Sequence, residues 1–291
     1  TVAGRHVRHR GGVYCAPMSP IDETYTHGHH PVVVGAHARR TAAEAAAFAL
    51  PRIRPGSRIL DFGCGPGSIT VGLADHIGPE GSVVGIDNSP DVVAIAAEAA
   101  ENRGNLRFDV ASVYDLPFSA GSFDVAYGHQ TLQHLADPVA ALSEVYRVLR
   151  PGGLIAVRDS DYGTMTHFPR YRELDSWLDL YHKVARANGG EPDAGRHLPR
   201  WVRKAGFVDS VISSSVWTYA TEAEREDWAT LWANRIVLPR FVDRSAQLGL
   251  AQRHEIEEIA SAWKRWAREP DGWFAFIHGE VIATKPARPD R

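Results

Sequence analysis

The sequence predicts an α/β protein built around a mostly parallel sheet. An apolar run over 58–62 leads into a turn with three glycines, and a helical pattern follows over 68–76. Short apolar segments and helical segments then alternate as far as about residue 160, as expected for parallel strands joined by crossover helices. Near the end of the chain, Trp273–Thr284 is expected to form a last strand that pairs antiparallel beside the sixth.

The bulk composition is that of an ordinary soluble globular protein. The chain has 291 residues, 44% hydrophobic and 23% charged, with a formal net charge of -3. Basic residues form no stripe that would bind nucleic acid, and no apolar run is long enough to cross a membrane. The two cysteines, Cys15 and Cys64, are expected to be free thiols. We therefore expect a cytoplasmic protein that binds small molecules, without membrane insertion.

The glycine turn is the strongest functional signal. It places Gly63, Gly65 and Gly67 at alternating positions, with Asp61 two residues before the first glycine. Without side chains, the turn allows a ligand to approach the backbone amides closely. The GxGxG spacing differs from the GxGxxG fingerprint of dinucleotide-binding proteins, so it favours another nucleoside-like cofactor.

At these residues the chain resembles class I S-adenosylmethionine (SAM)-dependent methyltransferases, whose first strand ends in acid-x-Gly-x-Gly-x-Gly. From about 55 to 160 it is similar to the ubiquinone/menaquinone C-methyltransferase group of small-molecule enzymes. The resemblance implies a Rossmann-like methyltransferase fold with a seven-stranded, mostly parallel sheet, an antiparallel last strand and helical lid insertions. It also implies that the three glycines and Cys64 border SAM, while Asp61 orders the turn or the amino group of SAM.

A second acidic position follows the predicted strand Ser82–Asp87. Asp87 stands 20 residues after Gly67, where a carboxylate can accept hydrogen bonds from both ribose hydroxyls. This arrangement serves SAM and NAD alike. Asp87 could instead cap the next helix, although Asn88 and Ser89 could also do so. We predict that Asp87 and Asn88 contact the cofactor.

The segment after a predicted third strand, 106–110, resembles the family's adenine contact. An acid usually stands where this chain has Ser112, so the adenine contact is altered here. We predict that the Ser112 side chain accepts a hydrogen bond from the adenine amino group. The Val113 amide is expected to serve a ring nitrogen.

Polar residues follow the next two predicted strands, 123–127 and 154–157. His129, Gln130 and His134 come after the first of these, and Asp159 comes after the second. Ligands of open α/β sheets bind at the carboxyl ends of the strands. His129 and Gln130 are predicted to adjoin the cofactor, and His129, His134 and Asp159 are candidate bases. His134 could instead pack within the sheet, and Asp159 could be a solvated surface residue.

The N-terminal part of the chain, residues 1–45, is interpreted as a tail followed by a lid over the cofactor or substrate. In related methyltransferases an N-terminal helix supplies a Tyr to the active site and an Arg to the SAM carboxylate, and we assign these roles to Tyr25 and Arg40. A solvated connector is the alternative. The His-rich run at 27–30 lacks accompanying carboxylates or cysteines at ligand spacing, so we predict no metal site.

The rest of the chain is divided into a SAM-binding core, 46–165, and helical insertions with the last strands, 166–291. These parts are expected to form one structural domain. Aromatic residues recur at helical spacing in the insertions, either as plain core or as the wall of an acceptor pocket. In this C-terminal part the predicted elements are helices at 172–187, 198–207, 222–235 and 253–268 and a strand at 208–219. Earlier in the chain, the Ala-rich stretch 41–50 is predicted to form a helix.

Together, these features predict a methyltransferase that moves a methyl group from SAM to a small, apolar or aromatic acceptor. Transfer to carbon, oxygen or nitrogen is left open. Because the methyl group of SAM is already activated, positioning of the acceptor and exclusion of water are the main tasks of the protein. Two alternatives are an NAD(P)-dependent oxidoreductase and a non-catalytic SAM-binding protein. A homo-oligomer would form through the N-terminal segment or the C-terminal helices.

Overall fold

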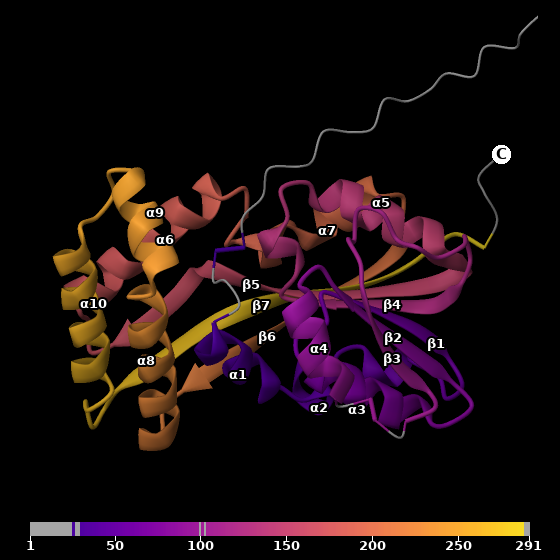
Figure 1. Ribbon diagram of the computed structural model, residues 1–291, viewed down its shortest axis with the longest axis horizontal. Coiled ribbons are helices and arrows are strands. Elements are labelled where there is room, and N and C mark those ends of the chain that lie inside the picture. Colours follow the sequence, from indigo (N-terminus) through magenta and orange to yellow (C-terminus); the bar gives the residue numbers. More distant parts are fainter. Residues whose placement is uncertain (1–24, 27–29, 99, 102, 288–291) are drawn as a thin grey trace, which may run out of the picture.

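One seven-stranded sheet runs through the whole molecule (Figure 1). The computed structural model describes residues 25–26, 30–98, 100–101 and 103–287. The strand order is β3-β2-β1-β4-β5-β7-β6. The first five strands run parallel, and β7 pairs antiparallel with both β5 and β6. The strands are β1 (Arg58–Phe62), β2 (Ser82–Asp87), β3 (Leu106–Val110), β4 (Phe123–His129), β5 (Leu149–Phe168), β6 (Val208–Tyr219) and β7 (Trp273–Thr284). The predicted fold class is confirmed.

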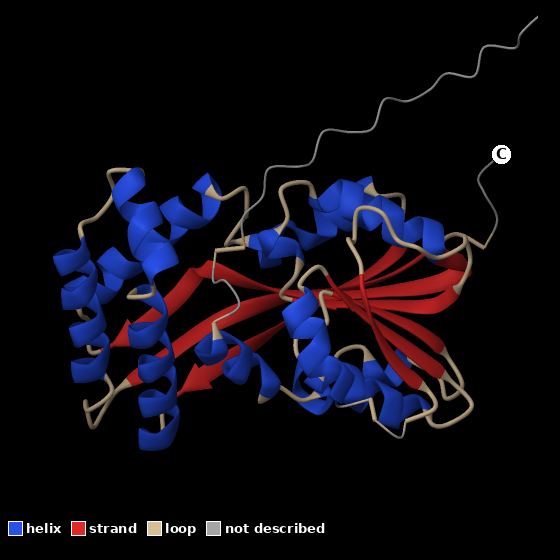
Figure 2. Cartoon of the chain, in the orientation of Figure 1, coloured by secondary structure: helices blue, strands red, loops and turns tan. Residues whose placement is uncertain are grey.

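Helices cover both faces of the sheet (Figure 2). The helices α2 and α3 lie on one face, and α5 and α7 lie on the other (Figure 1). A further group, α6, α8, α9 and α10, gathers at the end of the sheet that β5, β6 and β7 build. The α-helices are α1 (Pro31–Ala38), α2 (Ala42–Ala45), α3 (Ser68–Ile77), α4 (Pro90–Glu98), α5 (Pro138–Val148), α6 (Arg172–Ala187), α7 (Ala194–Lys204), α8 (Glu222–Ile236), α9 (Pro239–Gln247) and α10 (Arg253–Trp266).

The central strands of the parallel half, β1, β2 and β4, are largely buried on both faces, because helices cover each side. In β1, Leu60 and Phe62 face an apolar cluster with α5 and α7, whereas Ile59 faces a second cluster with α2 and α3. Successive side chains of a strand point to opposite faces, so this short run serves two cores at once. This double burial holds the turn after β1 on a rigid support.

Strand β5 is much longer than its predicted segment. It continues from Leu149 to Phe168, and its second half pairs with β7 as far as Phe168 opposite Trp273. The extended β5, β7 and β6 carry the helices of the C-terminal half on one face. Between them lies an aromatic core whose largest members are at most 1% exposed: Trp177, Trp232, Trp263 and Trp266. Truncating such a side chain to Ala typically costs about 3–5 kcal/mol, so these residues stabilise the fold.

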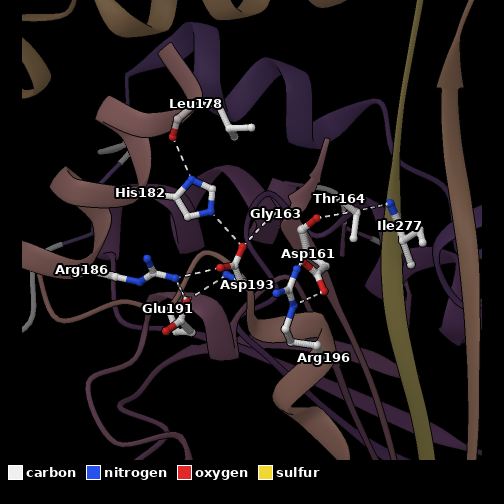
Figure 3. Close-up of polar contacts among 10 residues, drawn as sticks. All are labelled: Asp161, Gly163, Thr164, Leu178, His182, Arg186, Glu191, Asp193, Arg196 and Ile277. Atoms are coloured by element: carbon white, nitrogen blue, oxygen red, sulfur yellow. Dashed lines mark hydrogen bonds and ion pairs between the residues drawn. The ribbon is translucent and has the colours of Figure 1, made fainter. Parts of the chain in front are cut away.

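A partly buried polar cluster, with Asp161 and Asp193 at its buried centre, attaches α6 and α7 to β5 (Figure 3). The Asp193 carboxylate lies 2.9 Å from Nε2 of His182, and it accepts a hydrogen bond from the amide of Gly163. Nearby, Arg196 donates two hydrogen bonds to Asp161 at 2.7 and 2.5 Å. Charge-assisted bonds of this kind are stronger than neutral ones, so they fix the start of α7 against the strand.

Three local features differ from the sequence prediction. The predicted helix over 41–50 is shorter, since α2 ends at Ala45 and turns lead into a 3₁₀ helix at Leu50–Arg52. Pro51 disfavours helical conformation at the residue before it, which limits the helix on that side. The helices α1 and α9 were not predicted. In the part of the chain that the structure describes, no helix combines the length and apolarity needed to cross a bilayer.

Candidate active site

A cavity of about 180 Å³, here called the cofactor cavity, lies at the carboxyl ends of β1, β2 and β4 beside α1. In a doubly wound sheet this edge is where ligands bind. The cavity is lined by Tyr25, Val33, Val34, His37, Arg40, Asp61, Gly63, Cys64, Gly65, Pro66, Ser68, Ile69, Ile86, Asp87, Asn88, Val92, Ala111, Ser112, Val113, Tyr114, His129, Gln130, Thr131, His134 and Leu135.

Two glycines of the turn are required by different features of the backbone. Gly63 has a φ of 72°, and an added Cβ would lie 2.2 Å from Oγ1 of Thr131. Gly65 has a φ of 55°, but a Cβ there would meet no protein atom within 4 Å. Because Gly65 lines the cavity, the open space beside it is part of the cofactor cavity. Gly63 therefore allows Thr131 to pack closely against the turn, whereas Gly65 leaves the cavity wall without a side chain.

Gly67 lies outside the cavity lining. A Cβ on Gly67 would lie 2.6 Å from Cζ of Phe108, so this glycine permits close packing behind the turn. Asp61 is 2% exposed and accepts a 2.6 Å hydrogen bond from Oγ1 of Thr70 in α3. Burial raises the pKa of Asp61 to about 7, although the Thr70 hydrogen bond lowers it. Asp61 thus connects β1 to the helix that follows the turn.

Asp87 is held at the cavity wall by two backbone amides. Its Oδ2 accepts a hydrogen bond from the Gly65 amide at 3.1 Å, and its Oδ1 accepts one from the Ser89 amide at 3.0 Å. Ser89 Oγ accepts a bond from the Val92 amide at 3.4 Å, so Ser89 supplies the side-chain cap of α4. Asp87 and Asn88 both line the cavity.

The predicted adenine-contact residues also reach the cavity. Ser112 and Val113 line it together with Ala111 and Tyr114. The hydroxyl of Ser112 accepts a 3.2 Å hydrogen bond from the Tyr114 amide, which closes a tight turn after β3. A hydroxyl oxygen has two lone pairs, so Ser112 retains acceptor capacity for a second donor.

Tyr25 and Arg40 lie on opposite sides of α1 in sequence, and both line the cavity. Arg40 Nη2 donates a 2.7 Å hydrogen bond to Gln130 Oε1, and burial lowers the pKa of Arg40 to about 10. The Tyr25 ring stands edge-on to His134 with centroids 4.7 Å apart, and burial raises the pKa of Tyr25 to about 12. The helix α1 and its flanks thus cover the cavity.

The prediction about the His-rich run falls mainly on residues 27–29, outside the described residues. Within the described ranges, no group of three or more His, Cys, Asp or Glu side chains is arranged to hold a metal ion.

The structure brings both candidate histidines to the cavity. His129 ends β4, and neither of its ring nitrogens has a hydrogen-bond partner among the described residues. Burial, with the charges of Arg40 and Arg158, lowers the pKa of His129 well below its usual value.

His134 lies in a 3₁₀ helix, Leu132–His134. Its Nε2 lies 3.1 Å from the side-chain amide nitrogen of Gln133. Burial, followed by the charges of Arg235 and Arg40, lowers the pKa of His134 to about 3. Both imidazoles are therefore neutral at physiological pH.

Asp159 lies within the sheet, away from the cavity lining. The predicted strand stopped at Val157, but β5 continues and buries Asp159 completely. Its Oδ1 accepts a 3.3 Å hydrogen bond from the Gln133 amide, and burial raises the pKa of Asp159 to about 8. The carboxyl is therefore mainly protonated at pH 7. It supports the segment that carries Gln133 and His134.

A smaller cavity of about 30 Å³, here called the acceptor pocket, adjoins the cofactor cavity. Four residues line both spaces: His37, Arg40, Gln130 and His134. The remaining lining comes from the long strands and α8: Gln133, Ser160, Tyr162, Trp217, Trp228, Leu231, Trp232, Arg235 and Phe276. The helical insertions and last strands thus contribute most of this pocket.

Several residues of the site were not found from the sequence. His278 of β7 lies 2.8 Å from the Gln130 amide nitrogen, and Trp217 of β6 lies beneath the Arg40 guanidinium at 5.6 Å. Below them, the buried Arg158 and Glu280 form an ion pair at 3.2 Å. These contacts join residues more than 100 positions apart, so no local spacing indicates them. Thr131 was also missed, although a residue must pack against the glycine turn.

A mostly parallel α/β sheet with a glycine turn and a carboxylate beside a cavity at its carboxyl edge is typical of enzymes that bind a nucleoside cofactor. Comparison with known proteins agrees with this class. Residues 53–206 match the family described as "Methyltransferase domain". An uncharacterized methyltransferase of Schizosaccharomyces pombe is 33% identical over 280 residues, covering 91% of this chain and 98% of that protein. The chain therefore belongs to the methyltransferase domain family, whose enzymes take the methyl group from SAM.

Two further comparisons concern parts of the chain. The demethylmenaquinone methyltransferase of Lactococcus lactis is 32% identical over 168 residues, which cover 53% of this chain and 66% of that enzyme. A solved structure of the Haemonchus contortus phosphoethanolamine N-methyltransferase 2 has a TM-score of 0.51 at 20% identity. The match covers 80% of this chain and 50% of that chain. The expected resemblance to SAM-dependent small-molecule methyltransferases is thus confirmed at the level of family and fold.

Proposed function

We propose that this enzyme transfers a methyl group from SAM to a small, aromatic or otherwise apolar acceptor bound in the acceptor pocket. The observation that carries the proposal is the position of this pocket. It shares Arg40, Gln130 and His134 with the cofactor cavity, and aromatic side chains form most of its other walls. An apolar space with a few polar groups suits a flat organic molecule. A role in small-molecule biosynthesis follows.

The residues around the cofactor cavity fit SAM. Neither ring nitrogen of His129 has a partner within the described ranges, and the side of Gly65 that faces the cavity is open, which leaves polar and steric room for a ligand. In this assignment Asp87 holds the ribose hydroxyls and Arg40 holds the carboxylate. The remaining contacts are assigned to Tyr25, Asp61, Gly63, Cys64, Gly65, Asn88, Ser112, Val113, His129 and Gln130. Gly67 supports the turn from behind.

SAM supplies an electrophilic methyl group, so the protein's own task is to align the acceptor and exclude water. The lid residues Tyr25 and Arg40 are partly buried against the cofactor cavity, and Arg40 also lines the acceptor pocket, which supports the exclusion of water. His134 is neutral and stands at the boundary. With a pKa of about 3, it is a weak base that serves to orient an acceptor proton more than to remove it. Positioning is thus the main source of catalysis.

The proposal predicts methyl transfer to members of an aromatic acceptor panel. Purified enzyme would be incubated with SAM carrying a labelled methyl group and with phenols, hydroquinones, anilines and aromatic acids. We expect labelled product from at least one aromatic class and none from aliphatic alcohols or amines of similar size. An Asp87→Ala variant serves as the control, and it should lose transfer through weaker SAM binding. Transfer only to aliphatic or macromolecular acceptors would contradict the proposal.

A further inference from the structure

A buried arginine of α8, Arg235, lies in the wall of the acceptor pocket, and no Asp or Glu among the described residues pairs with it. Arg235 is 7% exposed, and its Nε is enclosed with no hydrogen-bond partner in the described part of the chain. None of the hydrogen bonds or ion pairs found between described residues involves its guanidinium. The guanidinium stacks on the ring of Trp232, with Cζ 4.9 Å from the ring centroid. Stacking positions the cation but leaves its five donors available in the plane.

The pocket around Arg235 differs from the cofactor cavity in its acidic residues. Asp61 and Asp87 line the cofactor cavity, whereas no Asp or Glu is among the described residues that line the acceptor pocket. A second cation, Arg40, stands at the boundary and is hydrogen-bonded to Gln130. The charge of Arg235 also lowers the pKa of His134 and of Tyr25, which places its field inside the site.

An enclosed Nε–H with no partner among the described residues is energetically costly, because it has lost its water and gained no hydrogen bond there. A ligand that brings an anionic oxygen group into the pocket would remove this cost. Arginine is also the side chain best shaped for a carboxylate, since its planar donors match the two oxygens. The aromatic walls formed by Trp217, Trp228 and Phe276 would then contact the body of the same ligand.

We propose that Arg235 binds the anionic group of the methyl acceptor, and that the acceptor is an aromatic carboxylate. This inference rests on the proposed function and names its substrate class. The methyl-accepting atom would point away from Arg235, toward His134 and the cofactor cavity. An anion on Arg235 would offset part of the positive field on His134, which would make this imidazole more basic when the acceptor is bound.

The acceptor pocket is too small to admit an aromatic acceptor without movement of its side chains. Its volume of about 30 Å³ is below the roughly 150 Å³ of a protein cavity that holds benzene, so side chains must move when an acceptor enters. His37 and Arg40 line both spaces and flank the lid. Cofactor binding would therefore reshape the acceptor pocket, and the ligand test requires enzyme already loaded with cofactor product.

The test is calorimetric titration of the full chain saturated with S-adenosylhomocysteine. The probes are benzoate, 4-hydroxybenzoate and 1-naphthoate, each beside its neutral amide. We expect at least one acid to bind at least tenfold more tightly than its amide. Arg235→Gln should weaken that acid at least tenfold, and Arg235→Lys should weaken it less. Arg268→Gln is the matched control, since it removes an exposed arginine outside the pocket and should leave the affinity unchanged.

The outcomes separate the two proposals. If S-adenosylhomocysteine fails to bind the wild-type chain, the proposed function is wrong. If it binds but no acid does, or if acids and amides bind equally, only the assignment of an anionic acceptor is overturned. Unchanged acid affinity in Arg235→Gln would overturn the role of this residue. Because the comparison of acid with amide uses wild-type protein, the inference stays testable even if a variant folds poorly.

Discussion

A methyl group added at Gly65 should weaken cofactor binding far more than it weakens the fold. Gly65 and Gly56 have positive φ values of 55° and 77°, and at both a Cβ would meet no protein atom within 4 Å. Each Ala variant should therefore lose about 1–2 kcal/mol of stability from the left-handed backbone alone. Only Gly65 lines the cofactor cavity, so only Gly65→Ala places its methyl group against the ligand.

The expected loss of affinity can be scaled from one ligand contact. Losing one hydrogen bond to a charged or polar ligand group costs about 1.5–3 kcal/mol, which corresponds to roughly 10- to 150-fold in Kd. Titration calorimetry with S-adenosylhomocysteine measures this, and thermal unfolding measures the stability of both variants. Gly65→Ala should bind at least tenfold more weakly, while Gly56→Ala should bind like the wild type. Equal affinities in the two variants would refute the assignment of Gly65 to the cofactor.

Three further predictions concern the supporting network. His134→Gln should reduce the methyl-transfer rate, because the acceptor is no longer positioned. The affinity for S-adenosylhomocysteine should stay within about twofold of the wild type, because the glycine turn is intact. A large loss of this affinity would show that His134 serves the cofactor instead. Glu280→Ala should destabilise the protein by about 3–5 kcal/mol in chemical unfolding, because it leaves the buried Arg158 without its ion partner; a loss below about 1 kcal/mol would contradict this. Burial lowers the pKa of His182, but the hydrogen bond to Asp193 outweighs it, so the pKa in the folded protein is raised. The contact therefore stabilises the fold below about pH 6.5, and this stabilisation is lost as the pH rises through the folded pKa. The pKa of Asp193 is lowered to about 2, so its carboxylate stays charged, and the contact stays in place, until the pH falls toward that value. His182→Gln should therefore cost roughly 1–2 kcal/mol at pH 5.5 and less at pH 8.5, and a cost that grows with pH would contradict the sign.

The half of the sheet that builds the cofactor cavity could be predicted because its signals are local. The turn at Gly63–Gly67 and the acid at Asp87 follow buried strands directly, and parallel strands bring their carboxyl ends to one edge. The same logic predicted that His129 and His134 would face one cleft. Even the departure at Ser112 did not remove this segment from the cavity. A short stretch of sequence decides each of these positions.

The acceptor side could not be predicted, because it depends on tertiary pairing. Nothing in the sequence around Asp159 indicates that β5 continues to Phe168, since that extension exists only through its pairing with β7. The same pairing brings His278 to Gln130. Arg235 resembles any basic residue in the last turn of a surface helix, and only the packing of α8 buries it.

The aromatic residues at helical spacing in the C-terminal helices fit two interpretations, plain core and the wall of an acceptor pocket. Helical spacing shows which residues share a face but not what that face contacts. In the structure Trp263 and Trp266 belong to the buried core, whereas Trp228 and Trp232 belong to that core and also line the acceptor pocket. Core and pocket are therefore not exclusive roles here.

The most direct test of the account is calorimetric titration of the wild-type chain and of Asp87→Ala with S-adenosylhomocysteine and, separately, with NADH. If the cofactor cavity binds SAM, we expect one S-adenosylhomocysteine site per chain and no NADH binding. We also expect Asp87→Ala to bind S-adenosylhomocysteine at least tenfold more weakly, because the ribose loses its carboxylate partner. Binding of NADH in its place, or unchanged S-adenosylhomocysteine affinity in Asp87→Ala, would contradict the assignment of this cavity to SAM.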